Sequence, residues 1–221
     1  MNLVLNSAEL RVLGALIEKQ MTVPEYYPLS LNALTAACNQ KNNRAPLVLY
    51  SDKDVVRALD SLRDKHLAYS VDTAGSRVPK YSHNFTKAFP LSNLQTAILC
   101  ELMLRGPQTV GELRTRNERF GETHTLPEVE SALESLSTSP EGSFVVKLPR
   151  EPGCRECRYT QLFSGPVNLT PEASQPTPEP ATLEVRAENE RLTSLETEVE
   201  SLHKEMEALR EQFSQFKRQF E

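Results

Sequence analysis

The chain has few of the residues on which catalytic and metal sites depend. It contains four histidines, all isolated in the sequence, and four cysteines among 221 residues. It has no Gly-rich phosphate loop, no nucleophile elbow and no His-Glu-x-x-His motif. The sequence therefore predicts a protein that is not an enzyme, needs no cofactor and holds no metal ion.

Long apolar runs are also missing. None approaches the ~18–20 apolar residues of a membrane span, and Met1–Arg11 lacks the basic start and apolar stretch of a signal peptide. Cysteines in a chain without a secretion signal indicate a reducing compartment rather than a disulfide framework. We therefore expect a cytoplasmic protein with no membrane partner.

Negative charge is concentrated at one end of the chain. Residues 1–85, 86–170 and 171–221 contribute net charges of +2, −1 and −6 to the total of −5. The body is thus nearly neutral, which neither requires nor excludes nucleic acid, because phosphate binding needs only a local basic patch.

An internal repeat organises the first three quarters of the sequence. Residues 54–62 recur as 128–136, both reading acid-Val-x-x-Ala-Leu-acid-Ser-Leu. Three shorter matches keep the same order, pairing 12–16 with 98–102, 30–34 with 109–113, and 80–81 with 158–159. Constant order with changing spacing is typical of packed elements joined by loops of different length. The sequence therefore predicts two copies of one module.

Each copy is predicted to contain three helices followed by a hairpin. Helix starts are indicated at Asn6, Ser30, Ser51, Ser92, Thr109 and Thr125. The third helix of the first copy is predicted to have a single buried stripe, formed by Val55, Leu59, Leu62 and His66. The hairpins are expected at 67–71 with 78–83, and at 144–148 with 158–163. This order is the winged-helix pattern of the helix-turn-helix group.

The C-terminal part has a different composition. Prolines are dense between residues 166 and 180, which predicts an extended linker without a core. Beyond it, apolar residues are spaced three and four apart, which predicts a parallel dimeric coiled coil. Its seam is Leu192, Leu195, Val199, Leu202, Met206, Leu209, Phe213, Phe216 and Phe220. The alternative is that this helix folds back onto the body.

The predicted fold is therefore α+β, mainly α with small β-hairpins. It comprises two tandem winged-helix domains, a linker and a C-terminal coiled-coil helix. The predicted boundaries are 1–88, 89–165, 166–182 and 183–221.

Several long strings resemble one known family. They are Glu18-Lys19, 26–34, 37–41, 44–46, 75–81 and 104–114. Together they are similar to the YceH-like family of uncharacterised bacterial proteins over roughly residues 5–165. The resemblance implies two tandem winged-helix domains and does not imply an activity.

Candidate nucleic-acid contacts lie mainly in the first copy. Its third helix mixes basic and acidic residues, whereas the third helix of the second copy has Glu128, Glu130 and Glu134 and no base between 128 and 136. Asn, Gln and Arg suit base edges, and Lys and Arg suit phosphates. The candidates are Asn39, Gln40, Lys41, Asn43, Arg44, Lys53, Arg57, Arg77 and Lys80. The alternative is that these residues serve loop solubility and helix capping. Arg114, Arg116 and Arg119 form a weaker basic group.

Cys154 and Cys157 have the spacing of half a zinc site, but no second pair of ligands follows them. We expect a hairpin tip that happens to contain two thiols.

The sequence thus favours a non-enzymatic regulatory or architectural protein that binds double-stranded DNA through its first domain as a homodimer. The alternative is a protein-interaction adaptor whose winged helices are docking surfaces without DNA contact.

Overall fold

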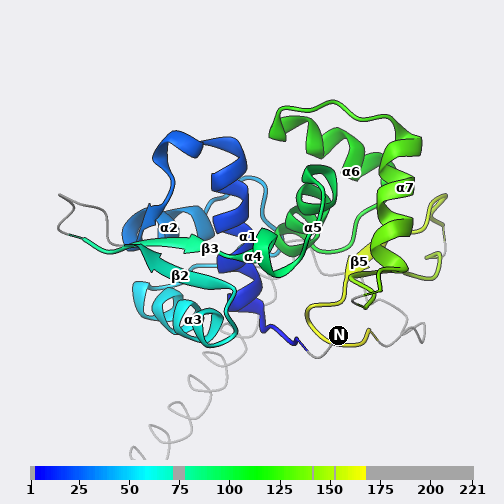
Figure 1. The fold of residues 1–221 in the computed structure, drawn as a ribbon. Coiled ribbons are helices and arrows are strands. Elements are labelled where there is room, and N and C mark those ends of the chain that lie inside the picture. The colour runs from blue at the N-terminus through cyan, green and yellow to red at the C-terminus, as the bar shows by residue number, and fades with distance from the viewer. Residues whose placement is uncertain (1–2, 72–77, 141, 152, 168–221) are drawn as a thin grey trace, which may run out of the picture. The chain divides into compact units, whose positions relative to one another are not determined.

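Two successive copies of one element order make up the described part of the chain. The computed structural model describes residues 3–71, 78–140, 142–151 and 153–167 (Figure 1). The first copy comprises α1 (Ser7–Thr22), the 3-10 turn η1 (Pro24–Tyr26), β1 (Leu29–Ser30), α2 (Leu31–Cys38), α3 (Asp52–Asp64), β2 (Ala68–Val71) and β3 (Lys80–His83). After the short α4 (Phe85–Ala88), the second copy comprises α5 (Asn93–Arg105), α6 (Val110–Asn117), the 3-10 turn η2 (Glu118–Phe120), α7 (Leu126–Ser137), β4 (Val145–Lys147) and β5 (Tyr159–Gln161). The predicted α+β class is confirmed.

Some predictions concern residues outside these ranges. They are Arg77, most of the linker, and the C-terminal helix with its seam.

Side-chain caps explain where most of the long helices begin. Capping boxes begin α1, α3, α5, α6 and α7. In a capping box, the side chain of the cap residue accepts a hydrogen bond from the backbone N–H of the third helical residue, and the side chain of that third residue accepts one from the backbone N–H of the cap residue. Ser30 caps α2, which ends at Cys38. The predicted helix starts are confirmed because a cap depends on residues only three apart.

The predicted apolar stripe of α3 ends one turn early. Val55, Leu59 and Leu62 are buried, but His66 is exposed and has φ of 58°. His66 N–H donates to the Arg63 carbonyl, and Leu67 N–H donates to the Leu62 carbonyl. These two bonds form a Schellman motif, which ends the helix and turns the chain into β2. The prediction that His66 lies in the core is therefore wrong.

The strands form two small antiparallel sheets. In the first sheet the order is β1-β3-β2, with Leu29 opposite Tyr81 and Ala68 opposite His83. In the second, β4 pairs with β5, with Val145 opposite Gln161. The two hairpins are confirmed, although each is shorter than predicted. The two-residue β1 was not predicted.

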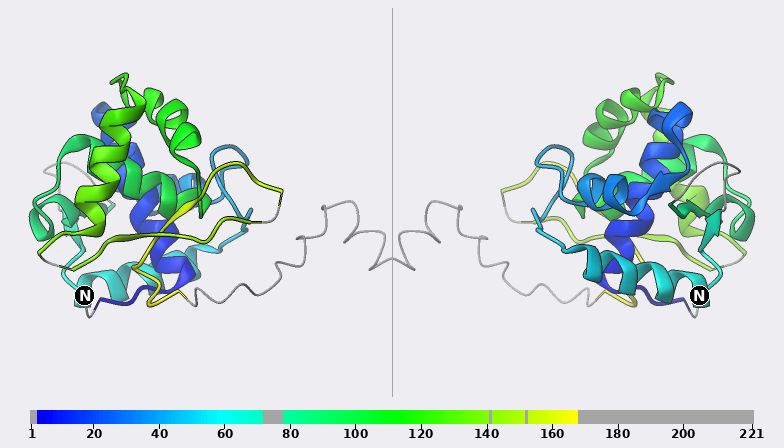
Figure 2. Two further views of the ribbon diagram at one scale, coloured as in Figure 1. Left: turned by 90° about the vertical axis from the view of Figure 1, so that its right-hand side faces the viewer. Right: turned by 90° about the vertical axis from the view of Figure 1, so that its left-hand side faces the viewer.

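The two copies share one hydrophobic core across α1 and α5, which pack side by side (Figures 1 and 2). A Cβ built on Gly14 would lie 2.9 Å from Leu104 Cδ2, so glycine allows this close approach. The Cys100 Sγ lies 3.4 Å from the Gly14 carbonyl oxygen. Gly14 and Cys100 are equivalent positions of the repeat, and such a contact is expected where two copies face each other about an approximate two-fold axis.

Candidate functional site

The outward face of α3 carries two of the predicted DNA contacts. Lys53 and Arg57 are exposed, lie one helical turn apart, and have no ion-pair partner among the described residues. The next cation on this helix, Arg63, lies 3.5 Å from the Asp60 carboxylate. α3 therefore presents two exposed cations near its N-terminus, although they alternate with Asp52 and Asp54 and Arg57 interacts electrostatically with Asp54.

Asn39, by contrast, is used inside the protein. Its amide nitrogen donates to the Tyr50 carbonyl at 2.8 Å, and its amide oxygen accepts from the Tyr50 N–H at 2.8 Å. These bonds hold the segment before α3 against the end of α2. To read a base edge, Asn39 would have to give up both bonds.

Arg44, predicted to contact DNA, has an exposed fraction of only 6%. Its guanidinium donates to both Glu18 carboxylate oxygens at 3.0 and 2.5 Å and to the Ala37 carbonyl at 3.2 and 2.8 Å. It also donates to Gln40 Oε1 and to the Asn43 carbonyl. The prediction that Arg44 is available to a phosphate is therefore corrected, because its hydrogen-bonding capacity is used within the protein.

The other candidates differ in accessibility. Lys41 is exposed on the turn after α2, and Lys80 is half-buried on β3. The Asn43 side-chain oxygen accepts from Arg105. Lys41, Lys53, Arg57 and Lys80 are thus the described candidates whose charges remain for a ligand.

A buried ionic network replaces the predicted surface role of Arg44. Glu18 on α1 accepts from Arg119 at 2.5 Å as well as from Arg44. Arg119 also lies 2.5 Å from the Glu101 carboxylate on α5, which in turn lies 3.3 Å from Arg105. The network therefore ties α1 to α5 and to the segments that follow α2 and α6.

The two acids of this network differ in their titration. Burial acts to raise the pKa of Glu18, but the hydrogen bonds and charge of Arg44 outweigh it and leave that pKa below its ordinary value. At Glu101 burial dominates, so its pKa is raised despite the charges of Arg119 and Arg105. Glu18 is therefore the acid held more firmly in its charged form.

Sequence reasoning missed this network because it expected charged helix residues at the surface. One signal was present. Glu18 and Glu101 each follow apolar residues on helices that are buried on nearly every side. An acid within such a run requires a buried partner.

The third helix of the second copy has the opposite character. Glu128, Glu130 and Glu134 on α7 are exposed. Arg116, part of the weaker basic group, is paired with Glu112 at 3.3 Å. The outward face of α7 is therefore acidic and would be repelled by phosphate.

The four cysteines are free thiols. Burial raises the pKa of Cys38 to about 12, as expected for a packing residue. Cys154 and Cys157 are half-buried on the connection between β4 and β5. Within the described residues, no group of three or more His, Cys, Asp or Glu could hold a metal ion.

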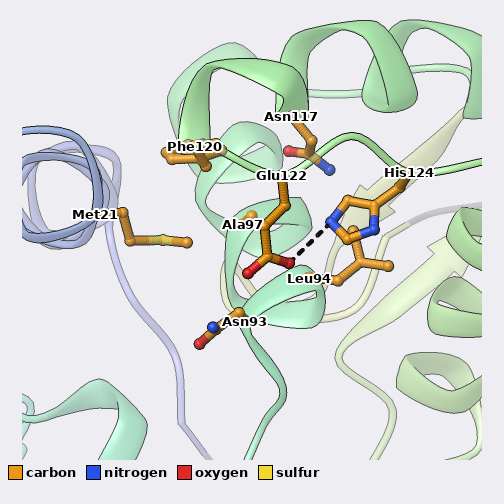
Figure 3. A pocket seen from close by; sticks show the side chains of 8 residues that line it. All are labelled: Met21, Asn93, Leu94, Ala97, Asn117, Phe120, Glu122 and His124. Carbon is orange, nitrogen blue, oxygen red and sulfur yellow. Dashed lines mark ion pairs between the residues drawn. The ribbon is translucent and has the colours of Figure 1, made fainter.

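A small pocket lies where α1 ends, α5 begins and α6 leads into α7 (Figure 3). Its volume is about 40 Å³, and a bound water occupies ~10–15 Å³ by the same measure. The Asn117 carboxamide lines it, and the Glu122 carboxylate and the His124 imidazole lie 3.5 Å apart at its edge. The pocket was not predicted, since its residues come from separate parts of the chain.

The described chain is thus an α+β protein built from two copies of a three-helix and hairpin unit, with no helix in the described ranges long and apolar enough to cross a membrane. It belongs to the DUF480 family, whose model, described as "Protein of unknown function, DUF480", matches residues 5–154. The comparisons do not bear on the YceH-like name, which stays a prediction.

Relatives support this membership over the whole chain. A UPF0502 protein of Geotalea daltonii is 54% identical over 221 residues, covering all of both chains. A UPF0502 protein of Geobacter metallireducens is also 54% identical over the full length of both. One of Opitutus terrae is 49% identical over 177 residues, covering 80% of this chain and 76% of that protein. Their names specify a bacterial family and no activity.

Proposed function

We propose that this protein is a cytoplasmic, non-enzymatic DNA-binding protein with two tandem winged-helix domains, of the YceH-like kind. The observation that carries the proposal is the pair of exposed cations on α3, Lys53 and Arg57, which have no ion-pair partner in the described ranges. The third helix of a helix-turn-helix unit is the element that enters the major groove. Lys41 and Lys80 would add phosphate contacts from the flanking turn and strand.

The test is duplex-DNA binding by the full-length protein at several salt concentrations. Affinity should fall as salt rises, because lysine and arginine release counterions from the phosphates. The Lys53→Gln/Arg57→Gln double variant should lower the slope of log affinity against log salt by about 2. Lys87→Gln/Lys147→Gln removes the same charge from exposed positions outside α3 and should leave the slope nearly unchanged.

Dimerisation is the second part of the proposal. It rests on the three-four spacing of the apolar residues from Leu192 to Phe220. Light scattering on the full-length protein should give twice the monomer mass. Leu202→Glu/Leu209→Glu, which puts charges into the seam, should give the monomer mass. A monomeric wild-type protein at tens of micromolar would favour the folded-back helix.

A protein-interaction adaptor is the alternative function, favoured by two surface features. α7 presents Glu128, Glu130 and Glu134 to solvent, which suits a basic partner. The loop between α2 and α3 exposes Leu47 and Leu49, the latter with an exposed fraction of 91%. This loop and the β4–β5 connection extend in the same direction (Figure 2). Undetectable duplex binding at ~50 mM salt and micromolar protein would favour the adaptor.

A further inference from the structure

The side chain of Asn117 is the least explained polar group in the described structure. Asn117 is the last residue of α6 and has an exposed fraction of 1%. Neither its amide nitrogen nor its amide oxygen has a hydrogen-bond partner among the described residues. Buried amides are normally satisfied, so an amide with both atoms unpaired points to a partner that is not among the described residues.

Figure 3 shows where this amide points. The Asn117 side chain hangs from the end of α6 into the pocket, above Glu122 and beside His124. Met21 and Phe120 lie on one side of the pocket, and Leu94 lies on the other. The space therefore has a polar end and apolar walls, an arrangement typical of sites for small organic ligands.

The first copy shows what such an amide binds. Asn39 directly follows α2, the counterpart of α6. Its amide accepts a hydrogen bond from the N–H of Tyr50 and donates one to the carbonyl of the same residue. The complement of an asparagine side chain is thus a donor next to an acceptor on one edge. Nucleobases offer this edge, as adenine does through its 6-amino group and N7.

The pocket limits the ligand further. A volume of about 40 Å³ admits the equivalent of ~3 waters, so it takes the edge of one ring while the rest of the ligand stays at the mouth. A flat ring suits apolar walls that include an aromatic side chain. At the mouth, the Glu122 carboxylate is 59% exposed and can accept from ribose hydroxyls.

We propose that the pocket binds a nucleobase, with Asn117 holding its donor–acceptor edge and Glu122 accepting from the attached sugar. The site lies between α1 of the first copy and α5, α6 and the segment after α6 in the second, so it is separate from the α3 face. The proposal does not depend on duplex binding. The base can come from a free nucleoside or from an unpaired nucleotide of a single strand.

Calorimetry with the full-length protein tests this, using adenosine as the probe. Adenosine should bind with one site per chain. N6,N6-dimethyladenosine keeps the ring but lacks the amino donor, and it should bind at least about tenfold more weakly. A dA oligonucleotide displaced by adenosine would identify the unpaired nucleotide as a further source of the base, whereas adenosine binding without oligonucleotide binding would identify the free nucleoside.

Two variants locate the binding. Asn117→Leu should weaken the binding of adenosine at least about tenfold. Its thermal unfolding should occur at the same or a higher temperature than in wild type, because a buried unpaired amide has been removed. Glu122→Gln, at an exposed position, should weaken the binding of adenosine more than the binding of free adenine. Glu118→Gln, at an exposed position that does not line the pocket, is the matched control for Glu122→Gln and should bind normally. Failure of adenosine to bind at ~1 mM, or equal binding by Asn117→Leu and wild type, would overturn the proposal.

Discussion

The two copies of the module are alike inside and unlike outside. Both begin their third helix with a capping box and bury the same Val, Leu and Leu positions of that helix. Their outward faces differ, because α3 presents Lys53 and Arg57 among exposed aspartates whereas α7 presents three glutamates and no basic residue. The asparagines at the ends of their second helices differ too, since Asn39, which follows α2, is paired and Asn117, the last residue of α6, is not. The common features are those that folding requires, so a specific function is to be sought in the differences.

Removing Arg44 should have the largest effect on stability. Arg44→Ala removes one of the two arginines that lie 2.5 Å from the buried Glu18 carboxylate and leaves only Arg119, and breaking a buried ion pair costs ~3–5 kcal/mol. Urea unfolding measures the change. The matched control is Lys41→Ala, an exposed cation on the same turn, which should change stability by less than ~0.5 kcal/mol. Equal effects of the two variants would show that the network does not stabilise the fold.

Equivalent core positions should have similar effects in the two copies. Leu59 on α3 and Leu133 on α7 are both fully buried. Leu59→Ala and Leu133→Ala should each lower the free energy of unfolding by ~2–5 kcal/mol, because each leaves a cavity. The body should still unfold in a single transition, because the core is continuous through α1 and α5. Two separate transitions, one affected by each variant, would mean that the copies fold independently.

The buried acids should respond to pH in opposite directions. The pKa of Glu18 is lowered on folding, so its contribution to stability is present above the ordinary value of 4.5 and is lost as pH falls through the folded pKa. The pKa of Glu101 is raised, so its contribution is present below 4.5 and is lost as pH rises through the folded pKa. The free energy of unfolding, measured at pH values below and above 4.5, should therefore fall less on acidification in Glu18→Gln than in wild type. In Glu101→Gln it should fall less as the pH rises above 4.5. The same change of slope in both variants would contradict the assignment.

The helix caps should give the smallest effects. Ser51→Ala and Thr125→Ala remove the caps of α3 and α7, and each should cost ~1 kcal/mol. Chemical denaturation of the two variants should therefore give nearly equal shifts in midpoint. A cost confined to one copy would show that its third helix is held by packing rather than by its cap.

The features that the sequence predicted are mostly local. Capping boxes need residues three apart, and the hairpins lie within single stretches of chain, so the start of α3 and the bounds of β2 and β3 were predicted closely. The pairing of β1 with β3 was missed because it joins segments about fifty residues apart. The end of α3 was misplaced because His66 adopts a left-handed conformation that the stripe does not reveal.

The candidate site was predicted less well for the same reason. Lys53 and Arg57 could be placed on an outward face from helical spacing alone. Arg44 could not, because its burial depends on Glu18, which is 26 residues away in the chain. The Asn117 pocket depends on three helices that meet only in the folded protein.

Duplex-DNA affinity, compared between matched variants of the two third helices, tests the central claim most directly. If DNA binds through the first copy, Lys53→Gln/Arg57→Gln lowers both affinity and salt dependence. Glu130→Gln/Glu134→Gln in the second copy then leaves affinity unchanged or slightly higher, since it removes only repulsion. The account is contradicted if the α3 variant binds duplex as tightly as wild type, or if the α7 variant is the one that loses binding.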